Sequence, residues 1–326
     1  MDIKIYSQNI IDYAVSNGVS DIFIFPKEDK YRIDLRNQKG LINWKTVEED
    51  QAQELISYFK YVGQMDIAEH RRPQVGSVEQ KRSDSKIFLR FSTTGDFLNR
   101  ESLVVRIIYG NKKNNYFFNT QFEQLKNLCY LRGLIITSGP TGSGKTSTMY
   151  DLARQVGMNK VVMTIEDPVE IYEPAFLQTQ INITAGIQYL DLMKAALRNR
   201  PDILIIGEIR DPETAKVAVN AALSGHLVLA TVHAKSSLQT ISRLEGLGIS
   251  SSELSNSLTA VSYQRLIYNN TLKAPACLFD IAYGEKLAEE ISSQERNSFV
   301  SWHNSLQSLR KEEKISETDF YLFQQG

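Results

Sequence analysis

Gly139–Thr146 carries the clearest chemical signal in this 326-residue sequence, because it matches the pattern G-x-x-x-x-G-K-[ST] in full. Glycines let successive backbone N–H groups turn inward on phosphate oxygens, and a following helix adds the partial positive charge of its N-terminus. In such a loop Lys145 would reach the β- and γ-phosphates, and the Thr146 hydroxyl could complete the coordination of Mg²⁺. The residues expected to bind a nucleotide are Gly139, Pro140, Thr141, Gly142, Ser143, Gly144, Lys145, Thr146 and Ser147.

Acidic residues follow two apolar runs that have the length of buried strands. Glu208 comes shortly after Ile203–Ile206, and Glu166 comes directly after Val161–Ile165. Open α/β sheets bind their ligands at the carboxyl ends of the strands, which is where both acids are expected. Phosphoryl transfer to water needs one group that acts on the water and one that holds the metal, and the residues alone leave open which acid is the base. Weaker candidates of the same kind are Asp167 and Glu170.

Two of the four histidines flank one predicted strand, Leu227–Thr231. His233 follows the carboxyl end of this strand, where its ring could sense the γ-phosphate in the neutral or the charged form. His226 precedes the strand and cannot reach the same place if the strand is regular. For His226 a structural role fits the sequence as well as a functional one.

A mostly parallel sheet is needed to bring these candidates together. Beyond about residue 120, short apolar runs alternate with segments of helical spacing, which implies crossover connections between parallel strands. Strands are expected at 134–137, 161–165, 203–206 and 227–231, and helices from about residue 145 and at 190–198, 213–223, 237–247 and 252–263. The final part of the chain is predicted to be a peripheral helical tail. The predicted domain, residues 116–326, is therefore α/β.

The first part of the chain predicts a separate small α+β domain, residues 1–110, whose strands can pair in antiparallel fashion. Helical spacing covers 1–18 and 48–65, and strand-like runs occur at 20–25, 31–35, 87–91 and 103–108. The first of these strands is expected to end at Pro26. The composition changes at Gly110–Asn115, which is the predicted linker between the two domains.

Composition excludes several classes of protein. Lys plus Arg (37) against Asp plus Glu (38) gives a formal charge of -1, so the chain has no overall basic field for nucleic acid. The one basic cluster, 70–72, fits a domain interface or the nucleotide side better than a DNA groove. No apolar run approaches the length of about 18 residues that spans a bilayer, and the N-terminus lacks a signal-peptide core. Only Cys129 and Cys277 are present, too few for a four-cysteine zinc site. A two-domain protein of the cell interior is expected.

Four segments in a fixed order resemble the secretion ATPases of type II secretion and type IV pilus assembly. They are GPTGSGKTS (139–147), TIEDPVE (164–170), ILIIGEIRD (203–211) and GHLVLATVHA (225–234). The resemblance extends over nearly all of residues 1–270, with GVSDIFIFP (18–26), GQMDIAEHRRPQVG (63–76) and LVVRIIYG (103–110) in the small domain. It implies a RecA-like P-loop ATPase that is a cytoplasmic homo-hexamer at the inner face of the membrane. Such enzymes use ATP and Mg²⁺ to drive pilins or pseudopilins through a polytopic membrane platform protein.

The resemblance also implies roles for individual residues. Glu166 would be the base that activates water, Glu208 would hold Mg²⁺ or its water, and His233 would approach the γ-phosphate. The same resemblance implies that the small domain closes on the nucleotide and brings Arg90 and Arg106 onto the phosphates. An arginine supplied in this way is a usual means of neutralising transition-state charge.

Two departures from the family pattern narrow the choice of subfamily. Many relatives carry a cysteine-rich zinc segment after the motif that reads YQRLI (263–267) here, whereas only Cys277 follows in this sequence. The sequence also carries no counterpart of the long amino-terminal domain of many relatives. It therefore resembles the zinc-free competence ATPase of Gram-positive bacteria, which assembles a pseudopilus for DNA uptake. The alternatives are a pilus retraction or conjugation-type ATPase, and a nucleotide-binding regulatory module without turnover.

Overall fold

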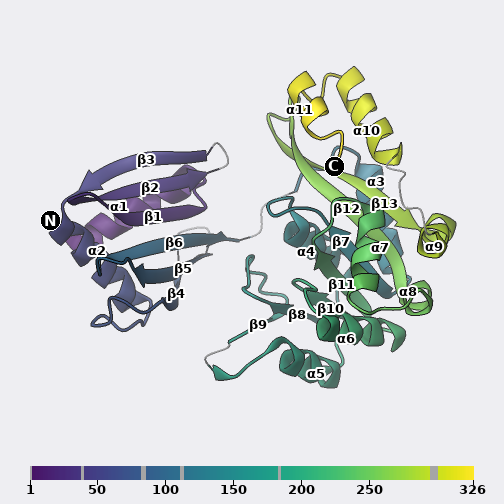
Figure 1. Ribbon diagram of the computed structural model, residues 1–326, viewed down its shortest axis with the longest axis horizontal. Coiled ribbons are helices and arrows are strands. Elements are labelled where there is room, and N and C mark those ends of the chain that lie inside the picture. The colour runs from purple at the N-terminus through teal and green to yellow at the C-terminus, as the bar shows by residue number, and fades with distance from the viewer. Residues whose placement is uncertain (1, 38–39, 82–85, 111–113, 183–184, 294–299) are drawn as a thin grey trace. The chain divides into compact units, whose positions relative to one another are not determined.

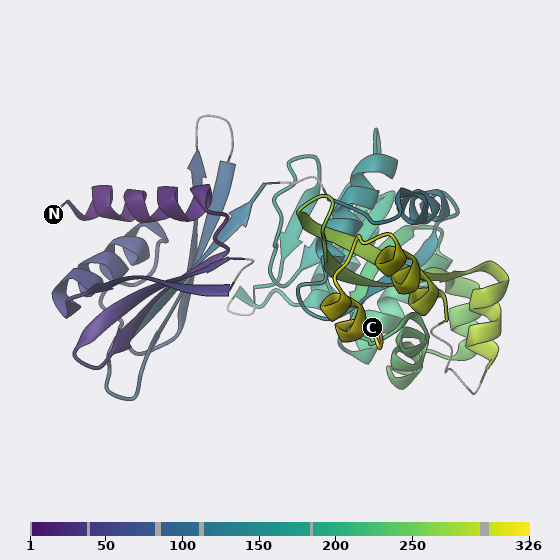
Figure 2. The ribbon, with the colours of Figure 1, turned by 90° about the horizontal axis from the view of Figure 1, so that it is seen from above.

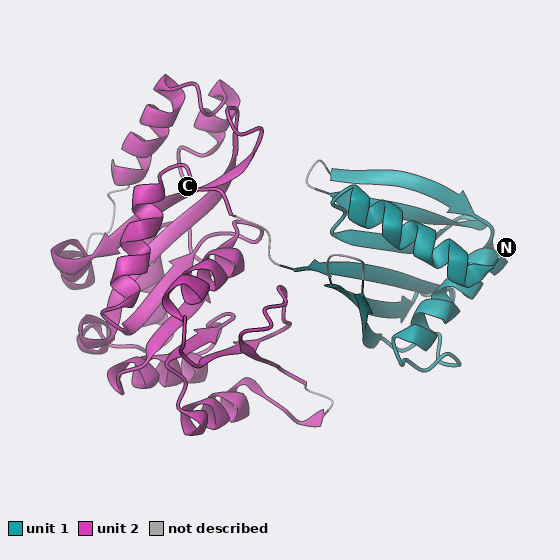
Figure 3. Ribbon diagram, turned by 180° about the vertical axis from the view of Figure 1, so that it is seen from behind, with its two compact units in different colours: residues 1–112 teal, residues 113–326 magenta. Residues whose placement is uncertain are grey.

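The chain falls into two compact units, Met1–Lys112 and Lys113–Gly326, which we call the small and the large unit (Figure 3). The computed structural model describes residues 2–326 except 38–39, 82–85, 111–113, 183–184 and 294–299. Part of the predicted linker at 110–115 lies outside these described residues. In the described part of the chain no helix is both long and apolar enough to cross a membrane.

The small unit is an antiparallel six-stranded sheet in the order β3-β2-β1-β6-β5-β4 (Figure 1). Its two helices share one apolar core with the sheet and cover one face of it (Figure 2). The elements are α1 (Ile3–Ser16), β1 (Asp21–Lys27), β2 (Lys30–Asn37), β3 (Gly40–Val47), α2 (Glu49–Val62), β4 (Gln74–Lys81), β5 (Lys86–Gly95) and β6 (Glu101–Tyr109). Asp2 caps α1 by accepting a hydrogen bond from the Lys4 N–H, and Gly18 follows the helix with a φ of 62°.

Two strands of the small unit, β3 and β4, were not predicted. β3 is exposed along most of its length, and β4 alternates half-buried with exposed residues. Neither strand therefore shows the alternation between buried apolar and exposed polar residues that marks a strand in a sequence. The predicted end of the first strand at Pro26 is also wrong, since β1 continues to Lys27 and pairs Pro26 with Tyr31.

The large unit is a seven-stranded sheet in the order β13-β12-β7-β11-β10-β8-β9. Neighbouring strands are parallel except for β12 and β13, which confirms the predicted α/β class. Helices α3 and α4 pack on one face and α5 to α9 on the other. The elements are α3 (Asn119–Cys129), β7 (Gly133–Ser138), α4 (Lys145–Val156), β8 (Val162–Glu166), β9 (Leu177–Gln180), α5 (Tyr189–Asn199), β10 (Ile203–Ile206), α6 (Pro212–Leu223), β11 (Leu227–Val232), α7 (Ser237–Gly246), α8 (Ser251–Ser257), β12 (Leu258–Asn269), β13 (Ala274–Tyr283), α9 (Gly284–Ser292), α10 (Val300–Lys311) and α11 (Glu317–Leu322).

The predicted helix at 252–263 is wrong in its second half. Helix α8 ends at Ser257, and the chain then enters β12, which pairs with β7 on one edge and with β13 on the other. Residues on both faces of the first half of β12 are buried or half-buried, so this stretch lacks the alternation that separates a strand from a buried helix. The correction matters for the site because β12 runs beside the phosphate loop.

Candidate functional site

The predicted site residues of the large unit lie at one edge of its sheet. Val232 at the end of β11 is in register with Ser138 at the end of β7, and β11 also pairs Ala230 with Ile206 of β10. Ile206 in turn pairs with Ile165 of β8. The four strands therefore end together, and each is followed, or in β8 completed, by a segment that carries candidate residues.

The loop between β7 and α4 depends on its glycines. Gly139, Gly142 and Gly144 have φ angles of 143°, 80° and 82°, a region that side chains with a Cβ rarely adopt. A Cβ on Gly139 would lie 2.5 Å from the Gln264 carbonyl oxygen. Helix α4 begins directly after the loop, and the N–H groups of its first turn have no partner within the helix. The loop and the helix start together form an anion cradle.

The Lys145 side chain lies back over this loop. Its Nζ donates hydrogen bonds to the carbonyl oxygens of Gly139 and Pro140, both at 2.9 Å. Burial lowers the pKa of Lys145, while the carboxylates of Glu208 and Glu170 oppose that shift. The ammonium group is thus held beside the cradle by two carbonyls that phosphate oxygens can replace.

Thr146 donates a hydrogen bond from its hydroxyl to Glu170 Oε2 at 2.9 Å. The sequence ranked Glu170 among the weaker candidates, yet the structure places its carboxylate against the residue expected to bind Mg²⁺. Glu170 is four residues beyond Glu166, and only the path of the chain after β8 brings it back toward α4. Its position in the segment 164–170 was the available signal.

Glu166 is the last residue of β8 and is only 2% exposed. Its Oε1 accepts hydrogen bonds from the hydroxyls of Thr164 and Tyr150, at 2.7 and 2.5 Å. Burial raises the pKa of Glu166, and the hydrogen bonds from Tyr150 and Thr164 partly oppose the shift. A raised pKa and two positioning hydroxyls suit a carboxylate that takes a proton. Tyr150, on α4, was not identified from the sequence.

Glu208 lies between two basic groups. Its Oε1 is 3.2 Å from His233 Nε2, and its Oε2 accepts hydrogen bonds from the Arg210 guanidinium at 2.7 Å. The contact with Glu208 raises the pKa of Arg210. The structure therefore brings Glu208 and His233 together, as their strand ends predict. His226 lies at the other end of β11, where its Nδ1 is 3.0 Å from the Ala221 carbonyl oxygen, which is a structural contact.

Arg90 and Arg106 belong to the small unit, where β5 and β6 place them directly opposite each other. Arg106 is half exposed, and its Nε donates to Asp21 Oδ1 at 2.8 Å. The structure thus gives Arg106 an acidic partner within its own unit. A function of either arginine at the nucleotide remains a prediction.

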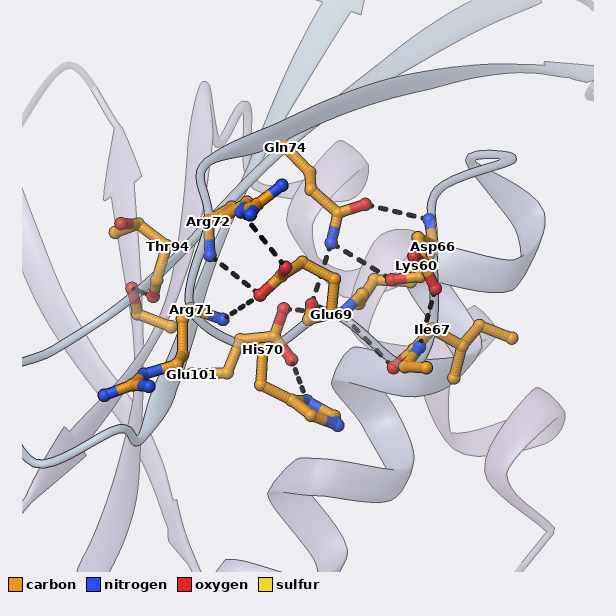
Figure 4. A network of polar contacts seen from close by, with 12 residues as sticks. Lys60, Asp66, Ile67, Glu69, His70, Arg71, Arg72, Gln74, Thr94 and Glu101 are labelled. Atoms are coloured by element: carbon orange, nitrogen blue, oxygen red, sulfur yellow. Dashed lines mark hydrogen bonds and ion pairs between the residues drawn. The ribbon is translucent and has the colours of Figure 1, made fainter.

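The basic cluster of the small unit is held by a network around a buried ion pair (Figure 4). Lys60 Nζ lies 2.7 Å from Glu101 Oε1, and both side chains are almost fully buried. His70 Nδ1 is 2.8 Å from the other oxygen of Glu101. The backbone N–H groups of Arg71 and Arg72 donate to Glu69 Oε1, which lowers the pKa of Glu69. These contacts fix the path of the loop between α2 and β4.

Purified protein should contain no stoichiometric zinc. Cys129 and Cys277 are both buried, and burial raises the pKa of Cys129 to about 12 and that of Cys277 as well. Neutral buried thiols pack as small apolar groups, whereas a zinc ligand must be a thiolate. Inductively coupled plasma mass spectrometry of protein purified without chelator checks this, and one zinc per chain would contradict it.

Comparison with known proteins identifies the family. The family described as type II/IV secretion system protein matches residues 2–307. The competence protein ComGA of Streptococcus pneumoniae is 41% identical over 261 residues, which are 80% of this chain and 83% of that protein. The competence protein ComGA of Bacillus subtilis is 39% identical over 278 residues, covering 83% of this chain and 77% of that protein.

The fold has counterparts among solved structures as well. The ATPase DotB of Legionella pneumophila superimposes with a TM-score of 0.77 over 98% of this chain and 95% of that chain, at 19% sequence identity. This likeness shows the fold, and the family match shows the kind of protein. Both confirm what the four motifs predicted. The chain therefore belongs to the type II/IV secretion system protein family, as an ATPase with a RecA-like phosphate-loop domain.

Proposed function

We propose that this ATPase works as a homo-hexamer that powers assembly of a competence pseudopilus, a fibre related to type IV pili that serves DNA uptake. The observation that carries the catalytic part is the convergence of the phosphate loop, Glu166, Glu208 and His233 at one sheet edge. The competence part is supported by the two relatives named competence proteins. The proposed partner is a polytopic membrane platform protein, which the ATPase contacts at the cytoplasmic face of the membrane and which acts on pseudopilins. The formal charge of -1 argues against direct contact with nucleic acid.

The donors at the site fit ATP with Mg²⁺. Hydroxyl and carboxylate oxygens are the ligands that Mg²⁺ prefers, and Thr146 and Glu208 supply them while the glycine loop offers a cradle for phosphates. When bound, Mg²⁺ would neutralise charge on the phosphates. Lys145 would bind the β- and γ-phosphates once it leaves the two carbonyls that hold it. His233, exposed beside Glu208, would sense the γ-phosphate.

Glu166 is the favoured base in this proposal. Its carboxylate is buried, carries a raised pKa and is aimed by two hydroxyls, whereas Glu208 already has a guanidinium and an imidazole as partners. Both carboxylate oxygens of Glu208 are engaged by these two partners, so neither is free to take a proton from water. The geometry therefore supports the roles that the family resemblance implies, with Glu166 as the base and Glu208 as the metal ligand.

A genetic and biochemical experiment tests the proposed function. Deleting the gene in its native host should abolish surface fibres and DNA uptake, and the wild-type gene should restore both. A membrane pull-down with the tagged protein should recover the platform protein, and the purified protein should release phosphate from ATP. Longer or more numerous fibres after deletion would instead indicate a retraction ATPase. Normal uptake after deletion, or nucleotide binding without any phosphate release, would contradict the proposal.

Arg106→Ala should lower turnover at least tenfold in protein confirmed hexameric by light scattering, because an arginine that completes the site stabilises transition-state charge. The melting temperature should fall only modestly, because Arg106 is half exposed and its buried partner Asp21 keeps the hydrogen bond from the Ser20 hydroxyl. Arg90→Ala should behave in the same way.

Asp21→Asn is the matched control for Arg106→Ala. It removes the partner of the ion pair and keeps both the arginine and the acceptor of the Ser20 hydroxyl. Turnover of Asp21→Asn should therefore stay near wild type. Equal losses in the two variants would show that the ion pair matters and not the arginine at the phosphates. Unchanged turnover of Arg106→Ala in an intact ring would refute the shared site.

A further inference from the structure

Strand β12 extends past the end of β7 and runs beside the phosphate loop. The pairing of the two strands ends at Tyr263 and Ser138, while β12 continues to Asn269. Successive side chains of a strand point to opposite faces, so Tyr263 and Arg265 share one face and Gln264 and Leu266 share the other. The two faces of this short stretch therefore contact different parts of the large unit.

One face of the stretch contacts the phosphate loop. Gln264 is fully buried, and its Nε2 donates to the Ser143 carbonyl oxygen at 2.6 Å. A Cβ built on Gly144 would lie 3.4 Å from both Gln264 Nε2 and the Leu266 side chain, which shows how closely the loop approaches β12. The backbone of β12 also limits the loop at Gly139, as described above.

The opposite face contacts the C-terminal helices α10 and α11, which lie over one end of β12 and β13 (Figure 1). The fully buried Trp302 packs edge-on against the Tyr263 ring, with ring centres 5.2 Å apart. Arg265 donates to the Tyr263 hydroxyl at 2.8 Å and to the Gly326 carbonyl oxygen at 2.5 Å. Trp302 Nε1 in turn donates to the Phe323 carbonyl oxygen at 2.8 Å. The tail thus holds β12 from the side away from the loop.

Two polar atoms at the contact between β12 and the loop are buried without a hydrogen-bond partner among the described residues. They are Gln264 Oε1 and Ser143 Oγ. Buried polar atoms are nearly always paired, and an unpaired one costs free energy. Both atoms belong to residues that touch each other at the nucleotide cradle, so a change in loop geometry can give them partners.

We propose that helices α10 and α11 set the position of the phosphate loop through β12, with Gln264 as the positioning residue. The tail fixes the Tyr263 and Arg265 face of the strand, and the Gln264 side chain transmits that position to the Ser143 carbonyl. The role of the tail is thus to tune nucleotide affinity. This inference rests on the proposed use of the loop as the nucleotide site, and it is independent of the pilus assembly role.

The experiment measures ADP·Mg²⁺ binding by isothermal titration calorimetry to the full chain. Gln264→Met keeps the length of the side chain and removes the N–H donor, and Arg265→Met removes the contacts with the tail. Each should weaken binding by about tenfold, the upper range for loss of one hydrogen bond. The matched control is Lys216→Met, which removes a half-exposed cation that pairs with Glu253 outside the tail and should bind as wild type. Circular dichroism should show all three variants folded.

The double variant Gln264→Met/Arg265→Met tests whether the two residues affect nucleotide binding through one chain of contacts or independently. Residues that act through one contact have non-additive effects, so the double variant should bind ADP about as weakly as either single variant. A hundredfold loss would show independent effects and overturn the proposal. The proposal also fails if Gln264→Met binds as wild type, or if Lys216→Met weakens binding as much as Arg265→Met. If the wild type itself binds no ADP·Mg²⁺, the nucleotide site fails together with this inference. A Trp302→Phe variant keeps an aromatic ring beside Tyr263 but loses the Phe323 bond and part of the packing, so it should weaken binding if the tail acts as proposed.

Discussion

Lys145→Ala should lower the rate of ATP hydrolysis by about 10²–10³-fold, because removing one preorganised charge from a phosphoryl-transfer site typically costs several kcal/mol of barrier. The fold should remain intact, since the hydrogen bonds of Nζ go to two carbonyls of the loop itself. Phosphate release at saturating ATP and the melting temperature are the two measurements.

Lys216→Ala is the control for Lys145→Ala. Lys216 is a half-exposed lysine of the same unit that lies outside the four motifs and pairs with Glu253 on the surface. Its loss removes the same charge from the protein and should leave turnover within about twofold, because exposed ion pairs contribute ~0–1 kcal/mol. Turnover near wild type for Lys145→Ala would contradict the assignment of the phosphate loop.

The nucleotide edge was predictable from the sequence because parallel strands end at one side of a sheet. Glu208 and His233 each follow a short apolar run, and Glu166 completes one, so each could be placed at this edge without knowing the order of the strands. Which of these side chains contact each other then depends on which strands are neighbours in the sheet. The direct contact between Glu208 and His233 exists because β10 and β11 are adjacent.

The rest of the site depended on packing between distant segments. Tyr150 lies on α4 and Gln264 on β12, and both reach site residues only across the faces or edges of the sheet. The sequence predicts a helix up to residue 263, directly before Gln264. It therefore did not predict the strand alternation that points the Gln264 side chain toward the loop. The burial that raises the pKa of Glu166 likewise comes from tertiary structure, as does the approach of Glu170 to Thr146.

Glu166→Gln should bind ATP·Mg²⁺ with near wild-type affinity and turn over about 10²–10⁴-fold more slowly, the range for loss of a general base. The amide keeps a carbonyl oxygen that can accept the hydrogen bonds from Tyr150 and Thr164, so the geometry survives. Glu208→Gln is the comparison. It should weaken nucleotide binding mainly when Mg²⁺ is limiting, because its proposed role is to hold the metal. Titrating Mg²⁺ in both variants separates the roles.

The pH dependence of turnover gives an independent test of Glu166 as base. Burial raises its pKa in the folded protein, and the base must be ionised to accept a proton. Wild-type kcat should therefore rise with pH through this raised pKa, and the residual activity of Glu166→Gln should lack that limb. The folded protein binds the proton more tightly than the unfolded chain, so ionised Glu166 lowers stability at neutral pH. Glu166→Gln should then melt no lower than wild type, which excludes unfolding as the cause of lost activity. An unchanged acidic limb in the variant would assign the base role to another residue.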